Sequence, residues 1–281
     1  MLLTVFSSLI VFVMMFTLFQ RSRLILTTQP LSELFFSSSW RPLSGEFGFH
    51  SFIIGTMWVT TLAMIFAVPI CLLSAIYLAE YAPNGVRSIV KPLIDLLAGI
   101  PSVVYGLWGV LTVVPLIRDY VAPFVGATTT GYSVLAGGIV LSIMVFPVII
   151  SVSEEVFRTV PYEVREASFA LGATRWQTVK HVVIRSSLPG VAASIILGFS
   201  RAFGETMAVL MVVGNVAKVP SSVFDPAYPL PALIANTYGD MMSIPLYDSA
   251  MLLAALILLL IVLFFNVVSR IILLRIERRS M

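Results

Sequence analysis

The sequence predicts an all-α integral membrane protein with about six transmembrane helices. Of its 281 residues, 59% are hydrophobic and only 11% are charged, and the mean hydropathy is +1.01. A soluble domain cannot bury so much apolar surface, so lipid must be the main solvent of this chain. An apolar stretch of about 18 to 20 residues is long enough to cross the hydrocarbon core as a helix. Six such stretches occur, at residues 2–19, 52–78, 93–117, 133–153, 188–214 and 250–274.

The first stretch, residues 2–19, is expected to be a retained span. A secretory signal peptide has a basic segment before its apolar core and a cleavage site of small residues after it. Neither feature is found here, and Arg21 and Arg23 follow the stretch directly.

Prolines interrupt the second, third and fourth stretches. They are Pro69, Pro101, Pro115 and Pro147. Proline removes a backbone donor and kinks a helix, and within a membrane this is tolerated where neighbouring groups satisfy the freed carbonyl. We therefore expect kinked helices in this part of the chain.

The third stretch, residues 93–117, also carries a stripe of small and polar residues. The stripe consists of Asp95, Gly99, Ser102, Gly106 and Gly109. Small residues at this spacing let helix backbones approach closely, so Gly99, Gly106 and Gly109 are expected at helix contacts. An alternative is that Ser102 and Tyr105 line a transport path.

The fifth stretch contains two charged residues, Arg201 and Glu205, followed by Thr206. A charge at the centre of a bilayer costs roughly 2.5 to 3.5 kcal/mol on insertion scales, so it needs a partner or a function. At positions i and i+4 of one helix the two side chains would share a face and could form an ion pair. The same face carries Gly198, which we expect to pack against a neighbouring helix. The pair either lines a polar path or only fixes helix packing.

The last stretch, residues 250–274, is followed by a basic tail. The basic residues of this tail and of the loops predict how the chain is oriented in the membrane. With six spans, eleven basic residues fall on one side of the membrane: Arg87, Lys91, Arg158, Arg165, Arg175, Lys180, Arg185, Arg270, Arg275, Arg278 and Arg279. The other side carries five. Cytoplasmic loops hold the excess of Lys and Arg, so both termini are predicted to be cytoplasmic.

The largest cytoplasmic loop, about residues 154–187, is expected to fold into two short helices. Pro161 suits a helix start, Glu163 suits its positive end and Gly172 can end the helix. Thr174 and Gln177 match a capping box, which predicts a second helix to about residue 184. The hairpin could fit a groove of a partner protein or be an ordinary surface loop.

Several functional classes are excluded or find no support. The sequence contains no G-x-x-x-x-G-K-[ST] motif, so the chain cannot be its own ATPase, and no nucleophile with an adjacent base indicates an enzyme. The lone Cys71 and the isolated His50 and His181 give no support for a metal site. The small excess of 17 Lys and Arg over 14 Asp and Glu, scattered over loops, gives no indication of nucleic-acid binding.

The cytoplasmic loop resembles a known signature. Glu166-Ala167-Ser168, followed after three residues by Gly172, is similar to the EAA motif of ABC importer permeases. The resemblance implies a type I importer fold in one permease domain over residues 1–281, with a core at about 52–274. It also implies that the loop is a pair of coupling helices, and that Glu166, Ala167 and Gly172 couple the permease to an ATPase.

Two further segments resemble phosphate permeases of that family. They are the segment from Leu97 to Gly109 and the segment from Arg201 to Thr206, which is similar to an R-A-x-G-E-T element. The continuation through Met207 resembles the PstC-type subunit. On this resemblance Arg201, Glu205, Thr206 and Ser102 are the residues expected to contact the transported phosphate.

The resemblance also implies partners. They would be a PstA-type permease as heterodimer, a PstB-type ATPase dimer that holds ATP and magnesium, and a PstS-type phosphate-binding protein, at the cytoplasmic (inner or plasma) membrane. No cofactor is expected in this chain itself. Two alternatives stay open: a permease for another oxyanion such as molybdate or sulfate, and a secondary transporter or a membrane scaffold.

Overall fold

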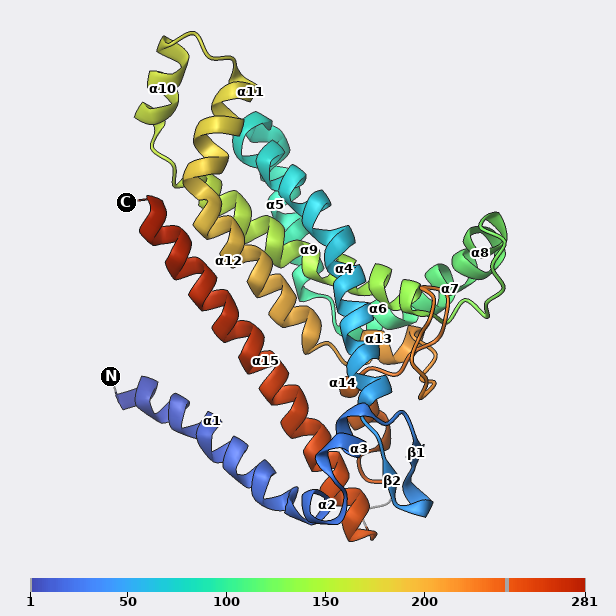
Figure 1. The fold of residues 1–281 in the computed structure, drawn as a ribbon. Coiled ribbons are helices and arrows are strands. Elements are labelled where there is room, and N and C mark those ends of the chain that lie inside the picture. Colours follow the sequence, from blue (N-terminus) through green and yellow to red (C-terminus); the bar gives the residue numbers. More distant parts are fainter. Residues whose placement is uncertain (1, 241–242, 281) are drawn as a thin grey trace.

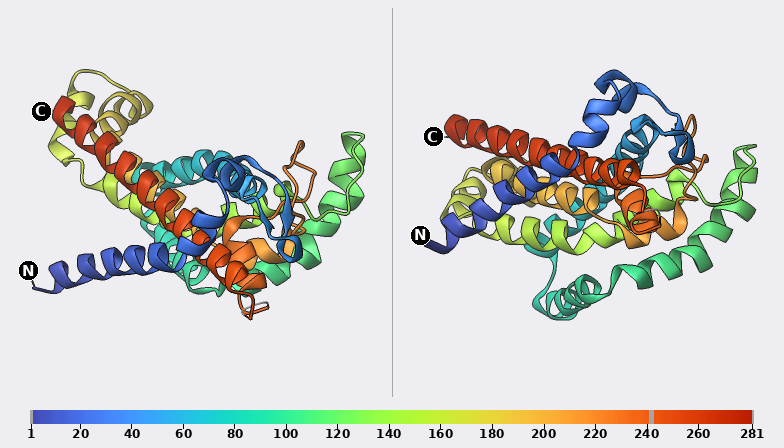
Figure 2. Two further views of the ribbon diagram at one scale, coloured as in Figure 1. Left: turned by 60° about the horizontal axis from the view of Figure 1, so that its bottom comes forward. Right: turned by 90° about the horizontal axis from the view of Figure 1, so that it is seen from below.

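The computed structural model describes the backbone of residues 2–240 and 243–280, and the side-chain surroundings of residues 9–240, 243–268 and 271. It confirms an all-α membrane protein. Five helical segments of the described chain are long and apolar enough to cross a membrane: His50–Tyr81, Ser102–Phe124, Val134–Arg158, Arg175–Phe203 and Pro245–Val268. The first expected span corresponds to a further apolar helix, α1 (Leu2–Arg21). It contacts α15 (Pro245–Ser280) near the start of α15 and splays away from it and from the other helices (Figures 1 and 2).

The centre of the bundle is α9 (Val134–Arg158), which packs against α4 (His50–Ile76) on one side and α12 (Ile184–Phe203) on another. The main apolar core lies between these helices and includes Ala67 and Val145. Ser133 caps the start of α9 by accepting a hydrogen bond from the Ala136 N–H. The fourth expected span therefore stands at the middle of the structure.

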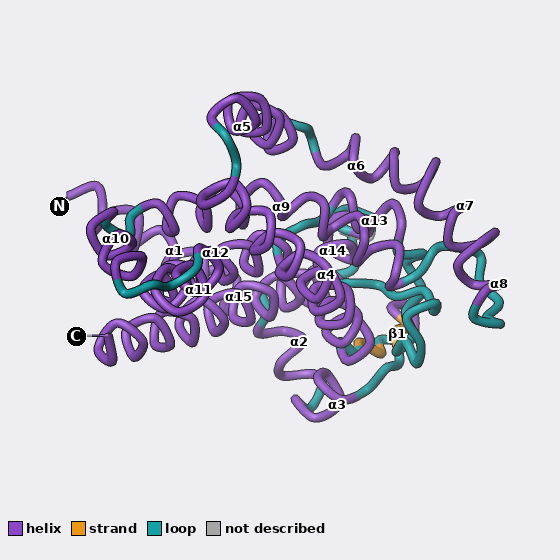
Figure 3. The backbone as a smooth tube through the Cα atoms, turned by 90° about the horizontal axis from the view of Figure 1, so that it is seen from above, coloured by secondary structure: helices purple, strands orange, loops and turns teal. Residues whose placement is uncertain are grey.

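The expected third span, residues 93–117, is wrong as a single helix. A separate helix, α5 (Asn84–Gly99), ends before Ile100 and Pro101, which are both extended. A new helix then runs from Ser102 to Phe124. A residue before proline is disfavoured in the α conformation, which explains why the chain breaks here. α5 packs against α9 at the edge of the bundle, and Figure 3 shows the short loop that joins it to this second helix.

The helix from Ser102 to Phe124 alternates between α-helical and wider π-helical turns. Its segments are α6 (Ser102–Trp108), η3 (Gly109–Val113), α7 (Val114–Leu116), η4 (Ile117–Val121) and α8 (Ala122–Phe124). Pro115 and Pro123 each lie two residues after the end of a wide turn. The expected irregularity at Pro115 therefore takes the form of π turns within a continuous helix.

The expected fifth span, residues 188–214, begins earlier and ends earlier in the structure. One continuous helix covers α11 (Arg175–Thr178), η5 (Val179–Val183) and α12. No Gly or Pro occurs between residues 175 and 188, so nothing breaks the helix where we expected a loop to end. The helix stops at Gly204, and α13 (Met207–Val212) is a separate short helix.

Three of the four glycines expected at helix contacts lie against a neighbouring helix: Gly106, Gly109 and Gly198. A Cβ on Gly109 would lie 2.7 Å from a methyl carbon of Val140 and 2.7 Å from one of Val212. A Cβ on Gly99 would have no atom within 4 Å, so its expected packing role does not hold within the described chain.

The two ends of the molecule differ in structure. One end is a small cap in which α2 (Arg23–Thr28), α3 (Leu31–Phe36) and α14 (Leu230–Thr237) surround the start of α15. A short antiparallel hairpin, β1 (Trp40–Arg41) and β2 (Glu46–Phe47), completes it, and Trp40 packs edge-on against Phe47 and Phe52. The other end carries α10 (Tyr162–Ala170), α11 and the last turns of α15 (Figure 1).

This arrangement predicts which loops share a side of the membrane. In a Cys71→Ala background, cysteines at Ser88 on α5 and Ala170 on α10 should react with a membrane-impermeant maleimide from the same side. A cysteine at Ser44, beside the β hairpin, should react only from the other side. The measurement is labelling of intact and of opened cells. Labelling of the Ser44 and Ala170 positions from one side would contradict the fold.

Candidate functional site

The hairpin between α9 and α12 is built by local signals in the sequence. Pro161 occupies the N-cap of α10, and Gly172 adopts a left-handed backbone (φ 84°) that turns the chain after α10. The Thr174 hydroxyl accepts from the Gln177 N–H at 3.3 Å, and the Gln177 amide oxygen accepts from the Thr174 N–H at 2.8 Å. The first short helix and the capping box are thus confirmed, whereas the expected second short helix is the first turn of the long helix to Phe203. Ser168 of α10 and Thr178 of α11 are joined by a 2.9 Å hydroxyl contact.

The three residues expected to couple to an ATPase all lie on the outside of this hairpin. Glu166, Ala167 and Gly172 are exposed. Beside them Leu171 is 90% exposed and Trp176 is 53% exposed, which leaves large apolar side chains on a segment that projects from the bundle. A projecting tip with apolar groups and a charged carboxylate has the features of a surface that binds another protein.

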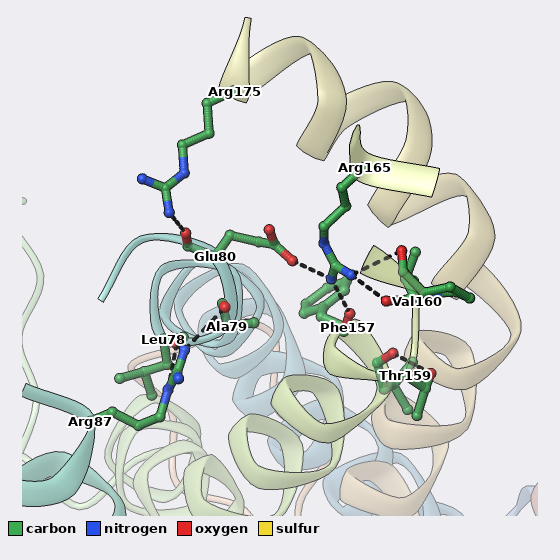
Figure 4. Close-up of polar contacts among 11 residues, drawn as sticks. Leu78, Ala79, Glu80, Arg87, Phe157, Thr159, Val160, Arg165 and Arg175 are labelled. Atoms are coloured by element: carbon green, nitrogen blue, oxygen red, sulfur yellow. Dashed lines mark hydrogen bonds and ion pairs between the residues drawn. The ribbon is translucent and has the colours of Figure 1, made fainter. Parts of the chain in front are cut away.

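Two arginines attach the hairpin to the end of α4, as Figure 4 shows. Arg165 of α10 donates to the Glu80 carboxylate at 2.7 Å and to the carbonyl oxygens of Phe157, at 2.8 Å, and Val160. Arg175 of α11 donates to the Glu80 carbonyl oxygen. Glu80 lies in the π-helical turn η2 (Tyr77–Tyr81) that continues α4. The hairpin therefore contacts both the end of α9 and the end of α4.

A second carboxylate, Glu154 of α9, is buried nearby. Its side chain is 5% exposed and lies 3.7 Å from Arg87 of α5 and 3.5 Å from Arg158. Arg87 also donates to the carbonyl oxygens of Leu78, at 2.5 Å, and Ala79, at 3.1 Å. Sequence reasoning treated these arginines only as orientation signals. The sequence did hold a signal for this contact. Glu154 lies at the polar end of an apolar helix, and a carboxylate that becomes buried there needs a cation beside it.

The break between α12 and α13 changes the expected arrangement of Arg201 and Glu205. The expected shared helix face and ion pair are wrong, because α12 ends at Phe203 and no ion pair involving Arg201 occurs among the described residues. Instead, the Glu205 carboxylate accepts from the backbone N–H groups of Thr206, at 3.1 Å, and Ala208, at 3.4 Å. Glu205 thus satisfies the donors at the start of α13.

The residues expected to contact substrate gather where two broken helices meet. Ser102, half-buried, opens α6, and Thr206, half-buried, precedes α13, which packs against α6. Arg201 is exposed in the last turn of α12, in the stretch of chain that leads to Thr206 and α13. These breaks lie between the hairpin end and the cap end of the molecule (Figure 1). The structure thus brings a guanidinium, a carboxylate and two hydroxyls into one region.

A mainly apolar cleft lies at the far end of α13. Its volume is about 500 Å³, and its lining includes Thr130, Tyr132 and Asn215. The part of the chain with described side chains contains no group of three His, Cys, Asp or Glu residues that could hold a metal ion.

Comparison with known proteins identifies relatives over most of the chain. A model of the family described as "Binding-protein-dependent transport system inner membrane component" matches residues 67–280. The phosphate transport system permease protein PstC of Xylella fastidiosa (strain 9a5c) is 36% identical over 262 residues, covering 88% of this chain and 80% of the relative. The probable ABC transporter permease protein YqgH of Bacillus subtilis (strain 168) is 40% identical over 228 residues, covering 79% and 72%.

Solved structures share the fold at low sequence identity. A chain of the inward-facing MetNI methionine ABC transporter has a TM-score of 0.61 at 18% identity, covering 79% of this chain and 93% of that chain. A chain of a bacterial alginate ABC transporter has a TM-score of 0.56 at 17% identity, covering 96% and 95%. These likenesses show a common helix arrangement.

Proposed function

The chain belongs to the family of binding-protein-dependent transport system inner membrane components, and on that premise we propose that it is the PstC-type permease subunit of an ABC importer for inorganic phosphate. Relatives named as phosphate permeases match over most of its length. The chain is a membrane component, and ATP hydrolysis belongs to a separate partner. Family membership argues against the alternative of a secondary transporter or a scaffold.

The observation that carries the phosphate proposal is the pair of helix breaks around Arg201. Helix starts have a partial positive charge and unpaired N–H groups, and broken helices in transporters direct these ends at anionic groups. Here the helix beginning at Ser102 packs against the one beginning at Met207, and Arg201 lies beside them. A guanidinium offers two parallel donors to an oxyanion. Glu205 occupies one helix start, which limits how tightly an anion would be held.

The partners of such a subunit follow from the same proposal. A second, PstA-type permease would complete the path, a PstB-type ATPase dimer holding ATP and magnesium would bind the α10–α11 hairpin, and a PstS-type protein would deliver phosphate. The exposed Leu171 and Trp176 support the ATPase contact, because they leave apolar surface on the hairpin tip.

We place the hairpin end in the cytoplasm and the cap end outside. The first turns of α5 hold Arg87 and Lys91, and the hairpin holds Arg165 and Arg175. Cytoplasmic segments carry the excess of Lys and Arg. The chain would then be a multi-pass protein of the cytoplasmic membrane with both termini inside.

The central test is transport by the purified complex. Reconstituted in proteoliposomes with its ATPase and binding protein, the complex should take up labelled phosphate only with ATP. A tenfold excess of molybdate or sulfate, which would offset an affinity weaker by about 1.4 kcal/mol, should reduce phosphate uptake only weakly. Uptake suppressed by molybdate or sulfate more than by unlabelled phosphate would instead support a permease for another oxyanion.

Replacing Arg201 tests its contact with the anion. Because Glu205 caps α13 and does not pair with Arg201, Arg201→Met leaves no carboxylate unpaired, so the complex should still assemble. Phosphate uptake should fall by at least about tenfold, and Arg201→Lys, which keeps the charge but loses the two-donor geometry, should retain part of it. Arg185→Met, on the same helix, is the control and should leave uptake unchanged. Normal uptake by Arg201→Met would remove Arg201 from the path.

Replacing Gly172 tests the docking surface. Gly172→Asp forces a Cβ into a left-handed backbone (φ 84°) and adds a charge at the hairpin turn. Gly126→Asp is a matched control, since Gly126 has φ 72° and, like Gly172, open space at the Cβ position, but lies in the loop after α8, far from the hairpin. We expect about a tenfold loss of ATP-driven uptake only for Gly172→Asp, as a charge placed in a docked interface costs more than about 1.4 kcal/mol. Equal effects of the two variants would contradict docking through this turn.

A further inference from the structure

We propose that a ring of charged contacts at the base of the docking hairpin joins the hairpin to the ends of α4, α5 and α9, so that these four parts move together when the ATPase moves the hairpin. This inference rests on the proposed function, because it presumes an ATPase docked on α10 and α11. We name the group of Glu80, Arg87, Glu154, Arg165 and Arg175 the coupling ring.

The first arc of the coupling ring holds Glu80 at two points. Its carboxylate accepts from Arg165 at 2.7 Å, and its backbone carbonyl oxygen accepts from Arg175. The Arg175 guanidinium also lies 4.8 Å from the centre of the Tyr81 ring, a cation–π contact. Both helices of the hairpin therefore grip the same residue at the end of α4 (Figure 4).

The second arc returns from α4 to α9. Arg87 of α5 donates to carbonyl oxygens of the α4 end and lies 3.7 Å from Glu154 of α9. Arg165 completes the ring, because it binds Glu80 at the end of α4 and also donates to the Phe157 carbonyl oxygen at the end of α9. Each of the three helix ends is thus tied to the next, and the hairpin is tied to two of them.

The hairpin has little else to hold it against α4. No residue of α10 is buried, and α10 packs mainly against α11 and η5, within the hairpin and its own continuation. The Glu80–Arg165 ion pair of the ring, in contrast, is shielded, because the Glu80 side chain is 10% and the Arg165 side chain 13% exposed. A shielded ion pair is weakly screened by salt, and removal of one partner leaves the other charge shielded without a counter-ion. Polar contacts, and not an apolar core, therefore determine how the hairpin meets α4.

Two π-helical turns border the coupling ring. Glu80 lies in η2, at the end of α4, and η5 directly follows α11 at the start of the long helix to Phe203. Single π turns are uncommon and often mark places where a helix bends in function. Because the ring contacts hold η2 and adjoin η5, they would confine bending to η5. Motion of the hairpin would then be transmitted directly to α4 and, through η5, to α12.

The experiment measures coupling in the assembled transporter, in a Cys71→Ala background. The variants are Glu80→Ala and a Glu80→Cys, Arg165→Cys pair, studied before and after linking the two thiols with a bis-maleimide. Asp119→Ala is the control, because its carboxylate also pairs with an arginine but is exposed and far from the hairpin. The readouts are co-purification with the ATPase, ATP hydrolysis, and phosphate moved per ATP hydrolysed.

We expect the Glu80→Ala complex and the unlinked cysteine-pair complex to assemble and to hydrolyse ATP. Both should move roughly tenfold less phosphate per ATP hydrolysed, because the loss of one partner of a shielded pair is a large perturbation. The thiol link should restore most of the ratio, and Asp119→Ala should not change it. An unchanged ratio in Glu80→Ala overturns the proposal. So does a ratio that the link does not restore. Failure of both variants to assemble also overturns it, because the ring would then be a folding requirement.

A measurement independent of the substrate separates this proposal from the proposed function. Spin labels at Glu163 on α10 and Tyr77 at the end of α4 should keep one distance with and without ATP in the parent complex, and should separate on ATP binding in Glu80→Ala. A distance that changes with ATP in the parent complex overturns the coupling ring. Absence of ATP-driven phosphate uptake by the parent complex would instead overturn the proposed function.

Discussion

The constraint on which this structure depends is that lipid cannot hydrogen-bond to backbone groups. Within the membrane every N–H and C=O must find a partner in the protein, which is why the long apolar stretches are helices. Where a helix breaks, side chains replace the missing partners. The Glu205 carboxylate accepts from two N–H groups at the start of α13, and the Thr56 hydroxyl accepts from the Leu230 N–H at the start of α14. At these two helix starts a side chain therefore supplies the partner that the helix lacks.

The distribution of charge follows from the same constraint. The buried carboxylates Glu80 and Glu154 each lie within reach of an arginine, as a charge removed from water requires. Arg201 differs from them, since no carboxylate pairs with it in the described part of the chain. It occupies the last turn of α12, where the negative end of the helix dipole favours a cation. A cation held by a helix end and not by a counter-ion remains available to an anion.

Local sequence signals predicted local structure well. Proline, glycine and the Thr174–Gln177 capping box determined the hairpin, because each acts within one helical turn. Apolar length located α1, α4, α9 and α15. The same reasoning was wrong for the third and fifth spans, since a count of apolar residues does not register one extended Ile100–Pro101 step or a helix end at Gly204. The Arg201–Glu205 pair failed for that reason, because it assumed an unbroken helix.

The sequence by itself determined that this chain is a helical membrane protein with a projecting polar hairpin, because composition, apolar length and capping residues act locally and need no partner. Only the tertiary structure decided which charges meet. Glu80 and Arg165 are separated by 85 positions, and the contact depends on how α4, α9 and the hairpin converge. Likewise, α6 packs against α13 because Gly106 lets the two helices approach closely. Contacts between distant segments depend on the packing of whole helices, which no local pattern records.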